Sequence, residues 1–279
     1  MPEKGVVVLD KPSGPTSHEV AAWVRDILGV EKAAHTGTLD PRVTGCLPVL
    51  FGPAARVSGL FAETPKEYVF VLELHGEPSR SLADVFEEFE GTIYQRPPVQ
   101  GSARRELRER EIEVLELLEQ CDTDTNRYLG RIECGAGTYI RKLCHDIGLA
   151  VGVGGHMAEL RRTKSGGFVV EDACYLQDLA DAAAVTDEDP ERLNALVTPL
   201  VDVLEGHEHL GLPRVEAAPN TVESVGNGAP LYAPGVLRVD EDCAENERCV
   251  VVADEDAVAV GTFHGEEAEP VVAPETVFV

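Results

Sequence analysis

The sequence has few lysines, no closely spaced cysteine pair and no long apolar run, and each shortage excludes a class of protein. Its seven cysteines include no C-x-x-C spacing, which argues against a zinc site, and their odd number argues against a secreted disulfide framework. There is no apolar run long enough to cross a membrane and no signal peptide. We therefore expect a soluble, cytoplasmic protein with no membrane partner and no bound metal.

The charge is strongly negative and unevenly distributed. Fifty acidic residues face 24 basic ones, a formal net charge of -26. Residues 1–170 hold 20 Lys and Arg against 25 Asp and Glu, a net of −5, whereas residues 171–279 hold 4 against 25, a net of −21. Only six of the basic residues are lysines. Acidity with scarce lysine suggests a salt-loving cell, and at roughly 1 M salt the Debye length is about 3 Å, so distant carboxylates scarcely repel an anionic partner.

Apolar periodicity and turn residues predict strands interleaved with a few helices in the first two thirds of the chain. Residues 5–9 form a predicted buried strand, and Ser17 is the expected N-cap of a helix that Gly29 ends. The other predicted segments are strands over 66–75, 111–118 and 127–134 and helices over 81–90, 138–150 (capped by Thr138) and 190–197. This pattern indicates an α+β fold with a mixed sheet and not a regular βαβ array.

The last third of the chain has a different pattern. Residues 205–213 have the composition of a linker. Beyond them, short valine-rich runs lie between Gly, Pro and Asn turns, at 236–239, 250–253 and 258–261. Such runs predict a small β-barrel.

One loop carries the strongest chemical signal. Residues 35–48 (HTGTLDPRVTGCLP) set a single carboxylate, Asp40, among Gly37, Pro41 and Gly45. Glycine permits tight or left-handed backbone and proline fixes φ, so the loop presents one side chain in one direction, as a nucleophile requires. An ordinary surface turn with an incidental aspartate has the same composition, and the loop alone does not separate the two.

Four further blocks accompany this loop in order along the chain. They are residues 5–20 (GVVVLDKPSGPTSHEV), 66–70 (KEYVF), 136–148 (AGTYIRKLCHDIG) and 155–166 (GHMAELRRTKSG). Together with the loop they resemble the TruB-type pseudouridine synthases, and most closely the archaeal and eukaryotic branch that includes dyskerin, the H/ACA guide-RNA enzyme. Residues 227–236 (NGAPLYAPGV) resemble the signature of the PUA domain, an RNA-binding module.

The resemblance implies a catalytic domain over residues 1–205, with a mixed, largely antiparallel sheet, and a PUA β-barrel over 210–279. It implies conversion of uridine to pseudouridine without a cofactor, in tRNA at T-loop position 55, in rRNA, or in both. For rRNA, the implied partners are an H/ACA guide RNA and small H/ACA proteins. A catalytically silent RNA-binding scaffold is the alternative. A glycosidase is disfavoured because only one carboxylate stands in a motif.

The resemblance also assigns the chemistry to three residues. Asp40 is the catalytic carboxylate, Arg141 its ion-pair partner, and Tyr68 the aromatic that stacks on the flipped base. A carboxylate that must stay ionised where water is largely excluded needs a cation beside it. Without the resemblance, Tyr68 fits a core aromatic of an alternating strand, and Arg141 an exposed arginine at a helix start.

Six further residues are expected to meet RNA or to support the cleft. By resemblance, Leu160 lines the base pocket and His35 lies near the flipped nucleotide, although core packing and a plain surface loop would explain them as well. Arg161, Arg162 and Lys164 are expected to contact phosphates, with a solvated basic stretch as the alternative. Lys11 is counted among the RNA-binding residues, and it is expected to brace the cleft and not to perform chemistry.

Overall fold

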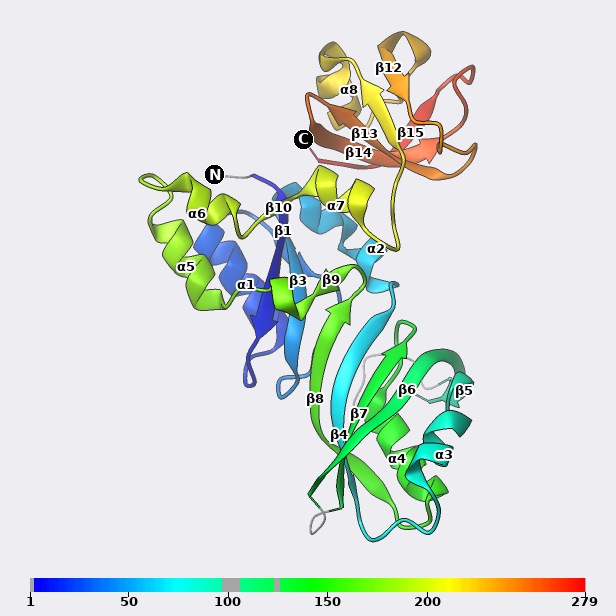
Figure 1. Ribbon diagram of the computed structural model, residues 1–279. Coiled ribbons are helices and arrows are strands. Elements are labelled where there is room, and N and C mark those ends of the chain that lie inside the picture. Colours follow the sequence, from blue (N-terminus) through cyan, green and yellow to red (C-terminus); the bar gives the residue numbers. More distant parts are fainter. Residues whose placement is uncertain (1–2, 97–105, 123–125, 279) are drawn as a thin grey trace.

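The structure, a computed structural model, describes residues 3–96, 106–122 and 126–278 and contains two sheets with helices around them (Figure 1). The strands of the larger sheet are β1 (Gly5–Lys11), β2 (Ala33–His35), β3 (Thr44–Phe51), β4 (Lys66–Leu74), β5 (Gly91–Gln95), β6 (Arg108–Asp122), β7 (Arg127–Cys134), β8 (Gly155–Ser165), β9 (Phe168–Val169) and β10 (Thr198–Pro199). Their order is β10-β1-β3-β8-β4-β7-β6-β5, with β2 beside β3 and β9 beside β8. Among the described strands of this sheet, only β3 and β8 pair in parallel. The expected α+β fold with a mixed, largely antiparallel sheet is confirmed.

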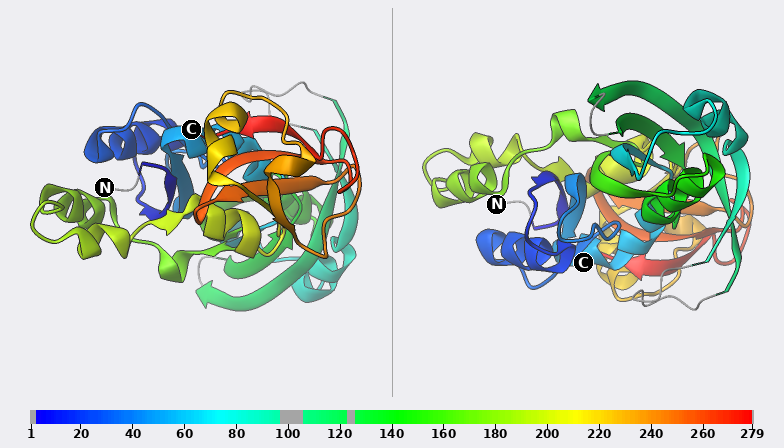
Figure 2. Two further views of the ribbon diagram at one scale, coloured as in Figure 1. Left: turned by 90° about the horizontal axis from the view of Figure 1, so that it is seen from above. Right: turned by 90° about the horizontal axis from the view of Figure 1, so that it is seen from below.

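Seven helices accompany this sheet in the described residues: α1 (Ser17–Leu28), α2 (Ser58–Ala62), α3 (Leu82–Glu88), α4 (Ile140–Ala150), α5 (Leu176–Ala184), α6 (Pro190–Asn194) and α7 (Leu200–Gly206). They divide its core into two apolar clusters. One lies under α3 and α4, and the other lies under α1, α5 and α6. Seen from above and below, α1, α5 and α6 form one end of the molecule and α3 the opposite end (Figure 2). Tyr68 and Leu160 contact both clusters, so they lie where the two halves of the sheet meet.

The helix ends differ from two predictions. Thr16, not Ser17, caps α1, because its hydroxyl accepts from the N–H of Glu19 while the Glu19 carboxylate accepts from the N–H of Thr16. Thr138 does not cap α4, since its hydroxyl donates to the carbonyl of Gly135 and the helix begins at Ile140. The predicted stop at Gly29 is confirmed, with a left-handed φ of 63°.

Other predicted bounds hold with local changes. The strand over 127–134 is confirmed by β7, whereas β6 extends well beyond the predicted 111–118 on both sides. The helix expected over 190–197 ends at Asn194, because residues 195 and 196 form a turn. A further helix, α7, covers the apolar stretch after it.

The C-terminal part forms a five-stranded sheet in the order β12-β11-β13-β14-β15. Its strands are β11 (Arg214–Ala217), β12 (Val236–Val239), β13 (Arg248–Ala253), β14 (Asp256–Phe263) and β15 (Val272–Val277), with helix α8 (Val222–Gly226) beside them. The three valine-rich runs fall in β12, β13 and β14, and their buried side chains are divided between an apolar core of this sheet and a cluster shared with the larger sheet. Within residues 213–278 the ladders run from β12 to β15 without joining these two ends.

A third apolar cluster joins the two sheets. It combines Phe61 of α2 and the apolar face of α7 with Val250, Val260 and Phe278 of the C-terminal part. The predicted linker takes part in this junction, because His207 is buried between the rings of Phe61 and Phe168. The segment 205–213 is therefore packed at this position and is not a bare connector. None of the helices in the described residues is long and apolar enough to span a membrane.

Candidate active site

The Asp40 loop joins β2 to β3, and two buried apolar side chains fix it to the core. Leu39 and Val43 are buried in the cluster under α1, while the side chain of Asp40 between them is 55% exposed. The N–H of Val43 donates to the carbonyl of Asp40 at 3.0 Å and closes a turn. Gly45 follows with a φ of 104°, a conformation that favours glycine. The loop therefore presents the Asp40 carboxylate outward from a fixed base, as its sequence predicts.

Side chains from the first strand and helix also hold this loop. The ammonium of Lys11 donates to the carbonyls of Pro41 at 3.1 Å and Val43 at 2.9 Å. The hydroxyl of Ser17 donates to the carbonyl of Leu39 at 3.0 Å and accepts from its N–H at 2.8 Å. Lys11 is fully buried, so it braces the loop as expected, and its assignment to direct RNA contact is wrong. Burial lowers the pKa of Lys11, and the negative charge of Asp40 opposes this shift.

Arg141 lies in the first turn of α4 and contacts the Asp40 carboxylate through its guanidinium. The expected ion pair is present, although 101 residues separate the partners. The side chain of Arg141 is 58% exposed, so the ion pair faces solvent in the free protein. An ion pair in contact with water contributes little to the free energy of unfolding. The main effect of this pair is therefore to fix how the two side chains lie relative to each other.

Tyr68 and Leu160 lie close to each other on neighbouring strands, β4 and β8. Both are half-buried at the boundary between the two apolar clusters. Burial raises the pKa of the Tyr68 phenol, and the positive charge of Arg162 opposes that rise. The phenol therefore stays protonated at neutral pH, and the two side chains offer an apolar surface.

Arg162 contradicts its prediction, because it is 1% exposed and cannot reach an RNA phosphate. Its Nε donates to the carbonyl of Cys46 at 2.8 Å and its Nη2 to the carbonyl of Gly37 at 3.1 Å. The neighbouring Arg161 points to the other face of β8. Cys144 of α4 is fully buried, and burial raises the pKa of its thiol.

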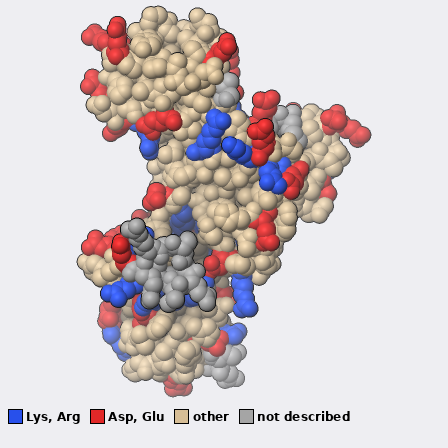
Figure 3. Space-filling model, turned by 180° about the vertical axis from the view of Figure 1, so that it is seen from behind, with Lys and Arg blue, Asp and Glu red and all other residues tan. Residues whose placement is uncertain are grey.

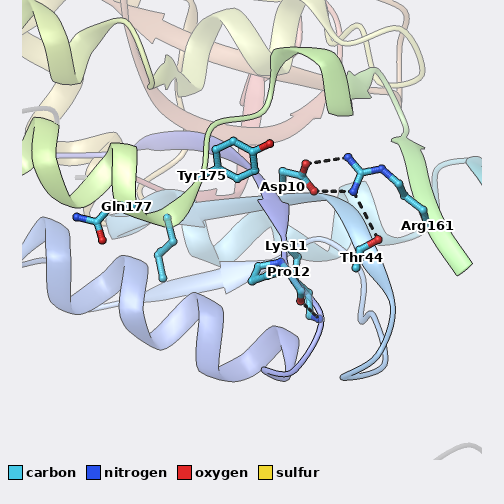
Figure 4. Close-up of a pocket in the computed structure, with 8 residues that line it drawn as sticks. Asp10, Lys11, Pro12, Thr44, Arg161, Tyr175 and Gln177 are labelled. Carbon is cyan, nitrogen blue, oxygen red and sulfur yellow. Dashed lines mark hydrogen bonds and ion pairs between the residues drawn. The ribbon is translucent and has the colours of Figure 1, made fainter. Parts of the chain in front are cut away.

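Arg161 and Lys164 remain accessible on β8. Arg161 donates twice to the carboxylate of Asp10, at 2.9 and 2.7 Å, at the side of a pocket of about 370 Å³ (Figure 4). Thr44 and the ring of Tyr175 lie on the same pocket. Lys164 is half-exposed, with its ammonium 3.7 Å from Glu67. Sequence reasoning missed this pocket, because its residues come from four distant segments.

His35 lies at the end of β2 with both ring nitrogens buried and without a partner among the described residues. Its ring meets the edge of His18, with centroids 4.8 Å apart, and burial lowers its pKa to about 4. His35 and His18 line a groove of about 720 Å³ together with Arg25, Lys32 and Arg56. Basic side chains also gather across the middle of the face seen in Figure 3. No sequence pattern indicates this groove, since its cations are isolated along the chain.

Family comparisons place the motifs in a known context. A model of the TruB family pseudouridylate synthase N-terminal domain matches residues 25–80. A model of the tRNA pseudouridylate synthase B C-terminal domain matches residues 141–205, and one of the PUA domain matches 213–268. A probable tRNA pseudouridine synthase B of Haloarcula marismortui is 51% identical over 234 residues, which cover 84% of this chain and 72% of the relative. The chain belongs to the TruB family of pseudouridine synthases.

Other members of the TruB family agree with this assignment. A probable tRNA pseudouridine synthase B of Halobacterium salinarum is 50% identical over 242 residues, 84% of this chain and 78% of that protein. Among solved structures, a Cbf5-Nop10-Gar1 complex matches with a TM-score of 0.81 and 40% identity, over 99% of this chain and 85% of that one. An H/ACA RNP bound to a substrate RNA containing 2'-deoxyuridine matches with a TM-score of 0.79 and 39% identity, over 99% and 85%. This TruB-family chain is thus an isomerase with a C-terminal PUA domain.

Proposed function

We propose that this TruB-family protein forms pseudouridine in tRNA at T-loop position 55, in rRNA as the catalytic subunit of an H/ACA guide ribonucleoprotein, or in both. The observation that carries the proposal is the contact between Asp40, on its braced loop, and Arg141 of α4. The two relatives from salt-loving archaea are named as tRNA enzymes, and the two solved structures are H/ACA assemblies. For the rRNA substrate, the partners are a guide RNA and small H/ACA proteins.

In the proposed reaction each residue has a separate part. The target uridine is flipped out of its RNA at a cost of a few kcal/mol and enters the space beside the loop. The Asp40 carboxylate then acts on the nucleotide, while Arg141 keeps it charged and oriented. Tyr68 stacks on the base and Leu160 lines its pocket. The ion pair faces solvent in the free protein. In this proposal the bound RNA excludes that water and so strengthens the attraction between Asp40 and Arg141.

RNA binding in this proposal uses accessible cations and the C-terminal sheet. Arg161 and Lys164 contact phosphates, and His35 lies against the space of the flipped nucleotide. The groove of Arg25, Lys32 and Arg56 adds a second surface with basic side chains. The half-exposed Tyr232 on the C-terminal part offers a ring on which a base can stack.

We divide the chain into a catalytic domain over 1–205 and a PUA RNA-binding domain over 210–279. The break falls between β10 of the larger sheet and β11 of the smaller one. We also propose that the protein works in the cytoplasm. All seven cysteines are free thiols, which suits a reducing compartment.

The proposal is tested by replacing the carboxylate alone. We expect Asp40→Asn to abolish pseudouridine formation and to leave RNA affinity nearly unchanged, because the two side chains are nearly isosteric and only the charge is lost. Purified protein is incubated at molar salt with transcribed tRNA, and separately with rRNA fragments plus guide RNA and the small partner proteins. Pseudouridine is scored by carbodiimide mapping, which also shows which substrate is used.

A matched control is available on α4. Asp146 pairs with Lys142 away from the Asp40 loop, and Asp146→Asn removes the same charge. It should keep wild-type turnover. Turnover by Asp40→Asn would reject the role of Asp40, and RNA binding without turnover by the wild type would favour the silent scaffold.

A further inference from the structure

Arg162 is a buried guanidinium without an acidic partner. It is 1% exposed, and within the described residues no carboxylate lies in ion-pair distance of it. Burying an ion costs several kcal/mol unless its contacts compensate for the lost water. Here backbone carbonyls compensate for the lost water. The role of Arg162 therefore depends on which segments carry those carbonyls.

The two carbonyls stand at opposite ends of the Asp40 loop. Arg162 binds Gly37 at the start of the loop and Cys46 just after its end. The space around Arg162 is filled. A Cβ on Gly37 would lie 3.3 Å from the Nη1 of Arg162, and a Cβ on Gly45 would lie 2.1 Å from the backbone carbonyl oxygen of Arg162. A planar guanidinium has a fixed fork of donors, so it also fixes the separation of the two loop ends.

Arg162 is also the cross-strand neighbour of Tyr68. Residues 68 and 162 are paired on the neighbouring strands β4 and β8, beside an irregularity in the ladder. The positive charge of Arg162 lowers the pKa of the Tyr68 phenol against the larger effect of burial, which agrees with that pairing. The guanidinium therefore contacts both ends of the loop, while its strand is paired with Tyr68.

We propose that Arg162 is a positioning residue, which holds the Asp40 loop and Tyr68 in one fixed relation without touching RNA. This inference rests on the proposed roles of Asp40 and Tyr68. Errors of about 1 Å in the placement of reacting groups reduce turnover by about 100-fold. A side chain that holds these groups in place, here called the Arg162 clamp, therefore matters for the chemical step. A guanidinium presents its donors in one rigid plane and an ammonium does not, so lysine at this position should hold the two carbonyls less precisely.

The test compares Arg162→Met with Arg162→Lys in the full chain at molar salt, with kcat and KM measured separately on the substrate that the wild type uses. We expect Arg162→Met to lower kcat by about 100-fold and to change KM by less than about threefold, because the lost contacts are not contacts to RNA. Arg162→Lys should recover part of kcat. The matched control is Arg131→Met, which removes a half-buried guanidinium from the ion pairs of β7 with Glu67 and Glu116 and should keep kcat.

A second readout separates positioning from general stability. Hydrogen–deuterium exchange should rise in the peptide covering residues 36–46 of Arg162→Met and stay unchanged in β1 and β7. The ¹³Cζ signal of Tyr68, assigned with Tyr68→Phe in protein carrying labelled tyrosine, should shift as the guanidinium is lost. If Arg162→Met does not fold, the same two readouts are taken on Arg162→Lys.

Two results would overturn the inference. One is an unchanged kcat in a folded Arg162→Met, and the other is a rise in exchange spread evenly over the sheet. Failure of the proposed function is recognised separately, by turnover in Asp40→Asn whatever Arg162 does. Inactive Asp40→Asn beside fully active Arg162→Met would reject only the clamp.

Discussion

Neighbouring residues of one type can have unrelated roles, and Arg161 and Arg162 illustrate this. Successive side chains of a strand point to opposite faces, so Arg161 reaches a surface pocket while Arg162 lies under the Asp40 loop. The Asp40–Arg141 pair shows a second residue-scale effect. Because it is exposed, water screens the attraction between the two charges.

We expect Arg141→Ala to lower turnover by at least about 100-fold, the usual loss when one charged contact to a reacting group is removed. Arg141→Lys should restore only part, since a point charge does not replace a planar fork. Stability should change by less than about 1 kcal/mol, because exposed ion pairs contribute little. Single-turnover rates and denaturant unfolding measure the two effects, with Lys142→Ala as the control on the same helix. A wild-type rate in Arg141→Ala would remove the ion pair from the mechanism.

Among the structural elements, the short parallel ladder between β3 and β8 connects the two halves of the larger sheet. It pairs Thr44 with Arg161 and Gly45 with Arg162, directly after the Asp40 loop. The strands approach so closely that Gly45 has no room for a side chain. The ladder therefore sets the position of the loop relative to β4 and Tyr68.

Gly45→Ala should destabilise the protein by at least about 1–3 kcal/mol, because a Cβ there would meet the Arg162 carbonyl oxygen at 2.1 Å and the φ of 104° is strained for alanine. Gly59→Ala is the control, since Gly59 lies in α2 with nothing within 4 Å of its Cβ position. It should be neutral or stabilising by up to about 1 kcal/mol. Denaturant unfolding in molar potassium chloride measures both. Equal stabilities of the two variants would show that the ladder tolerates a side chain.

At the scale of the whole molecule, charge and apolar packing act in opposite directions. About half of the net −21 over residues 171–279 belongs to residues 213–279, where 14 Asp and Glu face 3 Arg, a net of −11, and like charges repel one another. The apolar cluster between the two sheets and the buried His207 hold that part against the larger sheet. The balance depends on how far the charges are screened.

We expect stability and turnover to rise together with potassium chloride up to molar concentration. At about 0.01 M salt the Debye length is about 30 Å, so the C-terminal part repels itself and the RNA, whereas at about 1 M it is about 3 Å. Thermal unfolding and initial rates are followed across this range, with sucrose as an uncharged stabiliser for comparison. An ordinary RNA-binding protein loses affinity over the same range. A steady fall of both stability and turnover with added salt would show that the acidic composition is not an adaptation to high salt.

The sequence by itself determined the features that depend on local order. The Gly and Pro pattern around Asp40, the stop at Gly29, the strand over 127–134 and the division of charge along the chain were all predicted from neighbouring residues. The motif blocks also predicted the family. These features need no knowledge of which strands pair.

Only the tertiary structure decided what each basic residue does. Burial depends on the pairing of β3 with β8, segments more than 100 residues apart, and this pairing places Arg162 beneath the loop and leaves Arg161 outside. The same long-range packing takes Ser17 from the expected cap to the carbonyl of Leu39 and buries Lys11 under Pro41. A side chain's hydrogen-bond partner is set by its neighbours in space, and local sequence does not specify them.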